Sequence, residues 1–247
     1  MKYTYSQILD SLPVKKNSNS SWWVKLWVRK TSFLFTFLLI NLGFSPNGVS
    51  VLSIFVALFS FVCFAVPAMW TLVAAIVAIN LWLILDCVDG NIARCRKQKT
   101  IYGEFVDDIG GYYVVAFVYL AISIRTYVDG GIFLNGSHWI IVIGAVSCIS
   151  DILARLINKD YGNFSMKRSD YVPTDYINES KKSLSYIRRR VGKEIGISGA
   201  FMPLTILCGI FGAYDLMTLF YCAFNIFALV STTVIYIYKA DKYDREH

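Results

Sequence analysis

The chain has 247 residues, of which 56% are hydrophobic and 17% charged, and its formal net charge is +7. A mean hydropathy of +0.51, with apolar runs of about 20 residues that recur along the chain, excludes an ordinary soluble domain. We therefore predict an all-α integral membrane protein, whose positive charge marks the cytoplasmic side of the membrane and not a nucleic-acid partner.

The N-terminal region is predicted to lie at the membrane surface. Residues 1–19 are polar, and we expect them in the cytoplasm. Residues 20–43 combine tryptophans, such as Trp22, with basic residues, such as Lys25, and then become apolar. This mixture is typical of the headgroup level and predicts an interfacial amphipathic helix. A full membrane span is the alternative, and in either case Pro46 separates this segment from the next helix.

The region from 44 to 240 is predicted to be a catalytic membrane domain of six spanning helices, followed by a cytoplasmic tail at 241–247. The predicted spans cover residues 48–66, 69–93, 103–124, 138–157, 197–214 and 216–240. The long segment 158–196 between the fourth and fifth spans is polar and basic. Its charge fits the cytoplasmic side of the membrane.

Basic residues predict the orientation of these spans. With the N-terminus in the cytoplasm, every one of the 24 lysines and arginines except Arg125 lies on the cytoplasmic side or at its edge. This asymmetry is the pattern that membrane proteins follow. We therefore expect a protein of the cytoplasmic or inner membrane with both termini, and the acids described next, facing the cytoplasm.

Acidic residues gather at the ends of two successive predicted spans. Asp86 and Asp89 lie three residues apart, so that a helix presents both on one face. Asp107 begins the next span, and a hairpin brings it opposite the other two. Carboxylate oxygens favour Mg²⁺ or Mn²⁺, while Arg94 suits a phosphate. The plainer alternative is a set of solvated acids that pair with basic neighbours such as Arg96.

The spacing of these residues is specific. The stretch resembles the signature of the CDP-alcohol phosphotransferase (CDP-alcohol phosphatidyltransferase class I) family, Asp-x-x-Asp-Gly-x-x-Ala-Arg-x8-Gly-x3-Asp-x3-Asp. Seven of its eight fixed positions match, namely Asp86, Asp89, Gly90, Ala93, Arg94, Gly103 and Asp107. The segment around Pro46 and Asn47 also looks like the Pro-Asn element that precedes the first span of that family.

The resemblance implies a six-span enzyme, commonly a homodimer, that uses an alcohol to displace CMP from a CDP-linked donor. A membrane lipid, CDP-diacylglycerol, is the expected donor; a soluble CDP-alcohol with a lipid acceptor is the alternative. By resemblance, the metal ligands are Asp86, Asp89 and Asp107. Also by resemblance, the nucleotide pocket contains Gly90, Ala93, Arg94 and Gly103.

One position departs from the family pattern. The last aspartate of the signature, taken as the base that deprotonates the acceptor, falls on Gly111. Glu104 is three residues from Asp107 and shares its helix face, whereas Asp108 is turned about 100° away, so Glu104 is the better substitute by helical geometry. The open alternatives are another base, an acceptor that needs none, a bulkier acceptor, or a silent protein that binds nucleotide or lipid without turnover.

Basic residues further along the chain are candidates for a second phosphate contact. Arg155 lies four residues after Asp151 in the fourth span, as either a simple ion pair or a substrate-phosphate ligand. The fifth span is preceded by Arg188, Arg189 and Arg190, with Lys193 nearby. These residues fit cytoplasmic charge, anionic-lipid binding or binding of a substrate phosphate. A transporter is the remaining hypothesis, disfavoured because the acids lie at span ends and no pair of broken helices is visible in the sequence.

Overall fold

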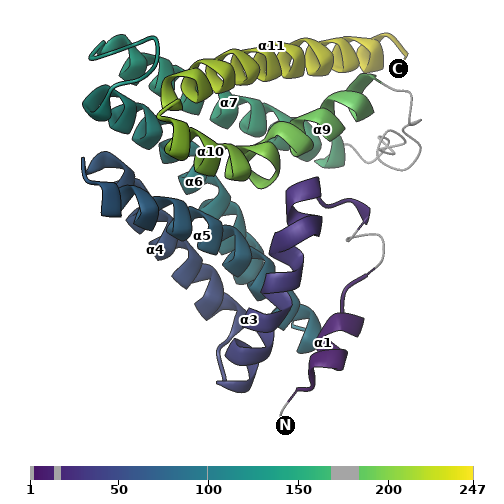
Figure 1. Cartoon of the computed structure of the whole chain (residues 1–247). Helices are drawn as coiled ribbons and strands as arrows, with labels where there is room; N and C mark the ends of the chain where they lie inside the picture. The colour runs from purple at the N-terminus through teal and green to yellow at the C-terminus, as the bar shows by residue number, and fades with distance from the viewer. Residues whose placement is uncertain (1–2, 14–17, 99, 168–183, 247) are drawn as a thin grey trace.

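The computed structural model describes residues 3–13, 18–98, 100–167 and 184–246. In these residues all regular secondary structure is helical, without strands (Figure 1). Six helices are long and apolar enough to cross a membrane. These candidate spans are Pro46–Ala65, Met69–Cys95, Ile101–Asp129, Trp139–Asn163, Arg190–Phe211 and Tyr214–Arg245. The prediction of an all-α integral membrane protein with six spans is thus confirmed.

The N-terminal region forms α1 (Tyr5–Asp10), η1 (Val24–Val28) and α3 (Arg29–Asn41). It is not among the six candidate spans. Its α3 continues directly from η1, so that residues 22–41 form one unbroken helical segment. The buried face of α3 carries polar as well as apolar side chains and packs on α5 (Met69–Cys95), whereas Leu34 and Leu38 are exposed. Its place at the membrane surface stays a prediction.

The remaining helices form two packed groups that meet at α6 (Ile101–Asp129). On one side, α4 (Pro46–Ala65) packs against both α5 and α6. On the other, α6 packs against α7 (Trp139–Lys167), which packs against the long α11 (Tyr214–Glu246). Figure 1 shows α4 and α5 in the lower half of the view, with α7 and α11 in the upper half.

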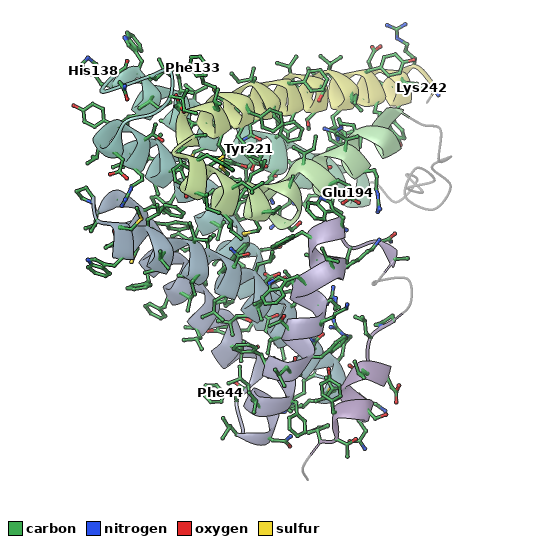
Figure 2. All side chains as sticks on the ribbon, viewed as in Figure 1. Phe44, Phe133, His138, Glu194, Tyr221 and Lys242 are labelled. Carbon is green, nitrogen blue, oxygen red and sulfur yellow. The ribbon has the colours of Figure 1, made fainter. Side chains whose placement is uncertain are left out.

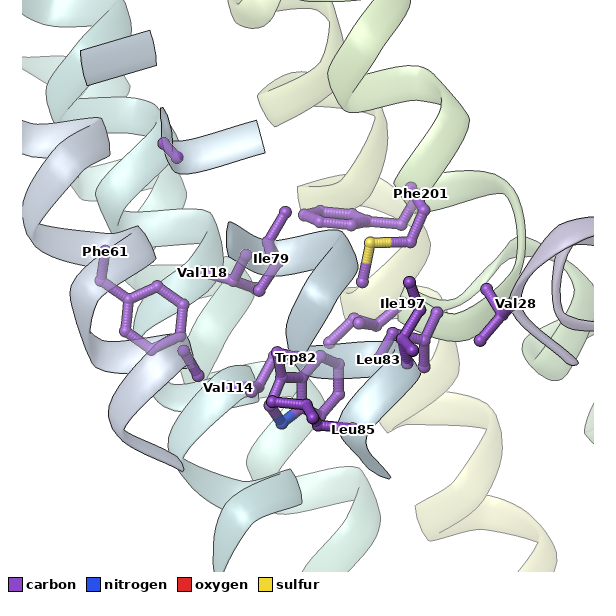
Figure 3. Close-up of a cluster of buried hydrophobic side chains, with 14 of the residues drawn as sticks. Val28, Phe61, Ile79, Trp82, Leu83, Leu85, Val114, Val118, Ile197 and Phe201 are labelled. Carbon is purple, nitrogen blue, oxygen red and sulfur yellow. The ribbon is translucent and has the colours of Figure 1, made fainter. Parts of the chain in front are cut away.

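The core lies where these groups meet (Figure 3). Ile79 and Trp82 of α5 are buried together with Val114 and Val118 of α6, and Phe201 is buried in the same core cluster. In lipid, such contacts are stabilised mainly by close packing, because the surrounding hydrocarbon is as apolar as the side chains. This core fixes how α5 and α6 carry the predicted acids.

The fifth candidate span differs from the predicted single helix over 197–214. It consists of the last part of α9 (Leu184–Ile195), the short η2 (Ile197–Phe201) and α10 (Met202–Phe211). It is broken at Gly199, whose φ and ψ are −109° and −115°. A Cβ at Gly199 would lie 2.0 Å from the Glu194 carbonyl oxygen, so this break requires glycine. The Tyr221 hydroxyl donates to the Ile195 carbonyl at 2.8 Å and satisfies a group that the break leaves free.

The N-terminal segment is tied to this break. The Ser21 hydroxyl donates to the Ser198 carbonyl at 2.5 Å, and the Trp22 backbone N–H donates to Glu194 Oε2 at 2.8 Å. Figure 2 labels Glu194 at the place where α9 meets the N-terminal helices. These contacts join the N-terminal segment to the broken fifth span beside the predicted site.

The opposite end of the bundle holds two buried charges. Arg125 is 3% exposed and donates to the carbonyls of Val66 at 2.5 Å and Ala68 at 3.1 Å, as well as to the Asp129 carboxylate. Asp215 is completely buried and accepts from the Phe133 backbone N–H at 2.6 Å. Because Arg125 is held inside the protein, α6 continues past the predicted end at residue 124.

Candidate active site

The site is built from three helix ends that meet at one end of the bundle. Ser45 caps the start of α4 by accepting from the Gly48 N–H at 3.0 Å, and Pro46 occupies the first helical turn. Thr100 caps the start of α6 by accepting from the Gly103 N–H at 3.0 Å. The C-terminal part of α5 lies between these two starts and carries the first half of the acidic motif.

One cavity of about 500 Å³, here called the Asp89 cavity, collects most of the predicted nucleotide residues. Its lining includes Asp89, Gly90, Ala93, Arg94, Gly103, Glu104 and Asp107, together with Asn47 and Ser50 of α4. A Cβ at Gly103 would lie 3.0 Å from Asn47 Oδ1, so glycine allows the starts of α4 and α6 to approach closely. The structure therefore brings both halves of the motif to one cavity.

Asp89 is held firmly within this cavity. Its side chain is buried, with 7% exposure, and Oδ2 accepts from the Ser50 hydroxyl at 2.5 Å. Oδ1 accepts from the backbone N–H of Gly90. A buried carboxylate with two such donors keeps a defined orientation. A side chain that coordinates a metal ion needs such an orientation.

A second cavity of about 560 Å³, here called the Asp86 cavity, adjoins the first. Asp86 and Gly111 line it, with Arg155 and Lys159 of α7 and the region of the break in the fifth span, from Gly192 to Ser198. Asp107 lines both cavities. The three predicted metal ligands are thus divided between two adjoining spaces, with one acid common to both.

The donor set fits a hard divalent cation in its chemistry. All three acids offer carboxylate oxygens, the ligands that Mg²⁺ and Mn²⁺ prefer. Within the described ranges, no group of three or more His, Cys, Asp or Glu side chains lies close enough together to hold an ion. The assignment of Asp86, Asp89 and Asp107 as metal ligands therefore stays a prediction, supported by the shared cavities.

The model of the CDP-alcohol phosphatidyltransferase family matches residues 44–211, which includes both cavities. The chain belongs to this family. No curated protein matches the chain. This membership confirms the family predicted from the sequence. It supports a membrane-embedded transferase that moves a phosphate group from a CDP-alcohol to an acceptor. Members of the family generally depend on divalent metals.

Gly111, which by resemblance corresponds to the last aspartate of the family signature, faces open space. A Cβ at this position meets no atom within 4 Å, and the residue lines the Asp86 cavity. Asp108 lines the same cavity, where Oδ2 accepts from Lys159 Nζ at 2.9 Å. Glu104, which helical geometry favoured as the substitute base, lines the Asp89 cavity instead. The structure therefore separates the two candidates by cavity.

Arg155 is oriented by Asp151 of the same helix, which is in turn bonded by Tyr119 of α6. Its Nε donates to Asp151 Oδ1 at 2.8 Å, and the Tyr119 hydroxyl donates to Asp151 Oδ2 at 3.4 Å. The side chain of Arg155 is 45% exposed and that of Asp151 is 15% exposed. The ion pair is therefore present and Arg155 also lines the Asp86 cavity, while its contact with a substrate phosphate stays a prediction.

Several residues of the site were not predicted from the sequence as site residues. Asn47 and Ser50 lie three residues apart on α4 and line the Asp89 cavity. The signal for them is the capped helix start at Ser45, which places both on the first turns beside the motif. Lys159 was not predicted either, since it belongs to a basic stretch without a motif.

Proposed function

We propose that the chain transfers the substituted phosphate of CDP-diacylglycerol to an alcohol, with release of CMP, in a reaction that depends on Mg²⁺ or Mn²⁺. The observation that carries the proposal is the division of Asp86, Asp89 and Asp107 over two adjoining cavities, with Asp107 common to both. Two substrates bound in such cavities meet at the shared acid, as a transfer between them requires.

The Asp89 cavity is the proposed donor site. Gly90 and Ala93 leave room for the cytidine nucleotide, and Arg94 supplies a planar cation for its phosphates. Asp86, Asp89 and Asp107 would hold the divalent cation, which neutralises the pyrophosphate and the CMP leaving group. Asp89 is kept in place by Ser50, so this part of the site is preorganised before substrate enters.

The Asp86 cavity is the proposed acceptor site. The acceptor oxygen forms a new bond to the phosphorus that bears the lipid, and the pyrophosphate P–O bond breaks as CMP leaves. We assign the departing hydroxyl proton to Asp108 because this carboxylate lines the acceptor cavity beside Gly111, whereas Glu104 lines the donor cavity. Arg155 is the proposed contact for a polar or anionic group on the acceptor.

The proposed enzyme faces the cytoplasm and works as a homodimer. Orientation is supported by the basic residues, of which every one but Arg125 falls on the side of the acids in the predicted topology. The dimer is supported by the family resemblance alone. Labelling of single engineered cysteines from each side of sealed vesicles and cross-linking in the membrane test these two points.

The decisive experiment measures CMP release by the purified full chain with Mn²⁺, CDP-diacylglycerol and a panel of alcohols. We expect CMP to appear with one acceptor class and to disappear when the metal is chelated. Binding of CDP without turnover on any acceptor would favour the silent protein that Gly111 suggests. Turnover with a soluble CDP-alcohol and diacylglycerol would show instead that the soluble molecule is the donor and the lipid is the acceptor.

A further inference from the structure

Asn91 lies inside the acidic motif, at a position that the motif leaves open, and it is completely buried. It faces α3, which packs on α5. Its side-chain Nδ2 donates to Ser32 Oγ at 3.3 Å and to Thr36 Oγ1 at 3.0 Å, and both hydroxyl residues are also completely buried. Its Oδ1 accepts from Nη2 of Arg94. One amide therefore joins the N-terminal helix to the proposed donor cavity.

The hydroxyls of α3 determine which way this amide points. The Ser32 hydroxyl donates to the Arg29 carbonyl at 2.9 Å, and the Thr36 hydroxyl donates to the Ser32 carbonyl at 2.6 Å. Each hydroxyl has a single proton, and a carbonyl can only accept. The hydroxyl oxygens of Ser32 and Thr36 can therefore only accept a hydrogen bond from Asn91. The Asn91 side chain must present its NH₂ group to them. The amide oxygen is left to face Arg94.

Arg94 depends on this oxygen for its orientation. Its side chain lines the Asp89 cavity, while its Nε is buried and has no hydrogen-bond partner among the residues that the structure describes. The amide oxygen of Asn91 is a neutral acceptor, so it fixes the guanidinium without cancelling its positive charge. A carboxylate at position 91 would fix the group and neutralise it at the same time.

We propose that Asn91, oriented by Ser32 and Thr36, is the positioning residue that holds Arg94 toward the phosphates of the donor nucleotide. The inference rests on the proposed donor site and assigns a role in it to α3. It explains why polar side chains of α3 are buried against α5, where apolar packing would otherwise serve. The fixed guanidinium loses less conformational freedom when the donor binds.

The test measures binding of CDP with Mn²⁺ to the purified full chain by calorimetry. Thr36→Val removes one acceptor for the Asn91 amide and keeps the side-chain shape. Thr31→Val is the matched control, because Thr31 also donates to the carbonyl four residues earlier, at 3.1 Å to Trp27, on the same N-terminal helical segment. We expect Thr36→Val to weaken binding about threefold or more and Asn91→Leu about tenfold or more, with Thr31→Val unchanged.

A double-variant comparison separates positioning from general damage to the fold. In the Arg94→Ala background, Asn91→Leu should cause no further loss of CDP binding, because residues that act through one group are not additive. An equal further loss in that background would overturn the inference, as would normal CDP binding by both Thr36→Val and Asn91→Leu.

The same measurements distinguish this failure from that of the proposed function. A wild-type chain that does not bind CDP contradicts the donor site and the inference together. Weak binding by Arg94→Ala alone, with normal binding by the Asn91 and Thr36 variants, contradicts only the inference. Normal binding by Arg94→Ala removes the role of Arg94 and therefore also that of Asn91.

Discussion

The two ends of the helical bundle use charged side chains in opposite ways. At the end with Arg125 and Asp215, the charges are at most 3% exposed and bonded to backbone groups of neighbouring segments. At the other end, Glu104, Asp107 and Asp108 are exposed on the walls of two cavities. The first arrangement joins helices to loops, whereas the second leaves carboxylates accessible to ligands.

The partners of a charged side chain separate a structural from a functional role in this membrane protein. A charge inside a membrane domain is costly, and both ends contain such charges, so their presence does not decide the role. Their partners do. Asp89 lies between the two classes, since it is 7% exposed and bonded by Ser50, yet it lines the proposed donor cavity.

The largest expected effect tests the functional end. Asp89→Asn should lower metal-dependent CMP release by about 10²–10³-fold, because the variant loses a charge that the proposed cation requires. Thermal unfolding in detergent should change little. Asp129→Asn is the control, since this aspartate pairs with Arg125 at the opposite end. Turnover of Asp89→Asn near the wild-type rate would contradict the proposed metal role.

The next effect tests the structural end. Arg125→Leu should destabilise the protein by about 2–3 kcal/mol, because the carbonyls of Val66 and Ala68 lose a charged donor. Arg125→Lys should destabilise the protein less than Arg125→Leu does. It should still cause some loss, because an ammonium lacks the planar fork that reaches several acceptors. Unfolding midpoints measure the loss, and CDP affinity of the folded protein should stay constant. A selective loss of CDP affinity would show that the two ends are coupled.

A third effect compares the two acids on α6. Asp108→Asn should slow turnover about a hundredfold with little change in donor KM, as expected for loss of a general base. Glu104→Gln should have a much smaller effect on the rate, because Glu104 lines the donor cavity. Steady-state kinetics of both variants decide between them. The reverse ranking would return the role to Glu104, as helical geometry alone suggested.

The smallest effect concerns adjacent glycines. Gly111→Ala should stabilise α6 by about 0.5–1 kcal/mol, because alanine favours helix and its Cβ meets open space. Gly110→Ala is the matched control, since its Cβ would lie 3.3 Å from Ile54 Cγ1 and crowd the contact with α4. Unfolding free energies of the pair test this difference. A destabilised Gly111→Ala would mean that the cavity wall is tighter than its geometry indicates.

Much of the fold was predictable from the sequence because each membrane span requires about 20 mostly apolar residues in a row. The six predicted apolar segments correspond to six candidate spans. Residues from both halves of the acidic motif line one cavity, whereas Asp86 lines the adjoining one. The helix ends were less accurate. Arg125 reads as a polar loop residue in the sequence, but its backbone partners allow α6 to continue to Asp129.

Other features depend on contacts between distant segments, which local patterns do not contain. The break at Gly199 is satisfied by Tyr221 of α11 and by Ser21 near the N-terminus. The role of Asn91 depends on two hydroxyls of α3, separated from it by more than 50 residues. The division of the acids into two cavities likewise appears only when α7 and the fifth span close around Asp86.

The place of Asp107 at the junction of both cavities has a consequence for inhibition. A compound that joins cytidine diphosphate to a mimic of the acceptor alcohol through a short tether would occupy both spaces at once. Such a bisubstrate ligand gains affinity from linkage, because its second half binds at a high effective concentration. In the proposed reaction, the residue beside which the two substrates meet is thus also the point across which they can be chemically joined.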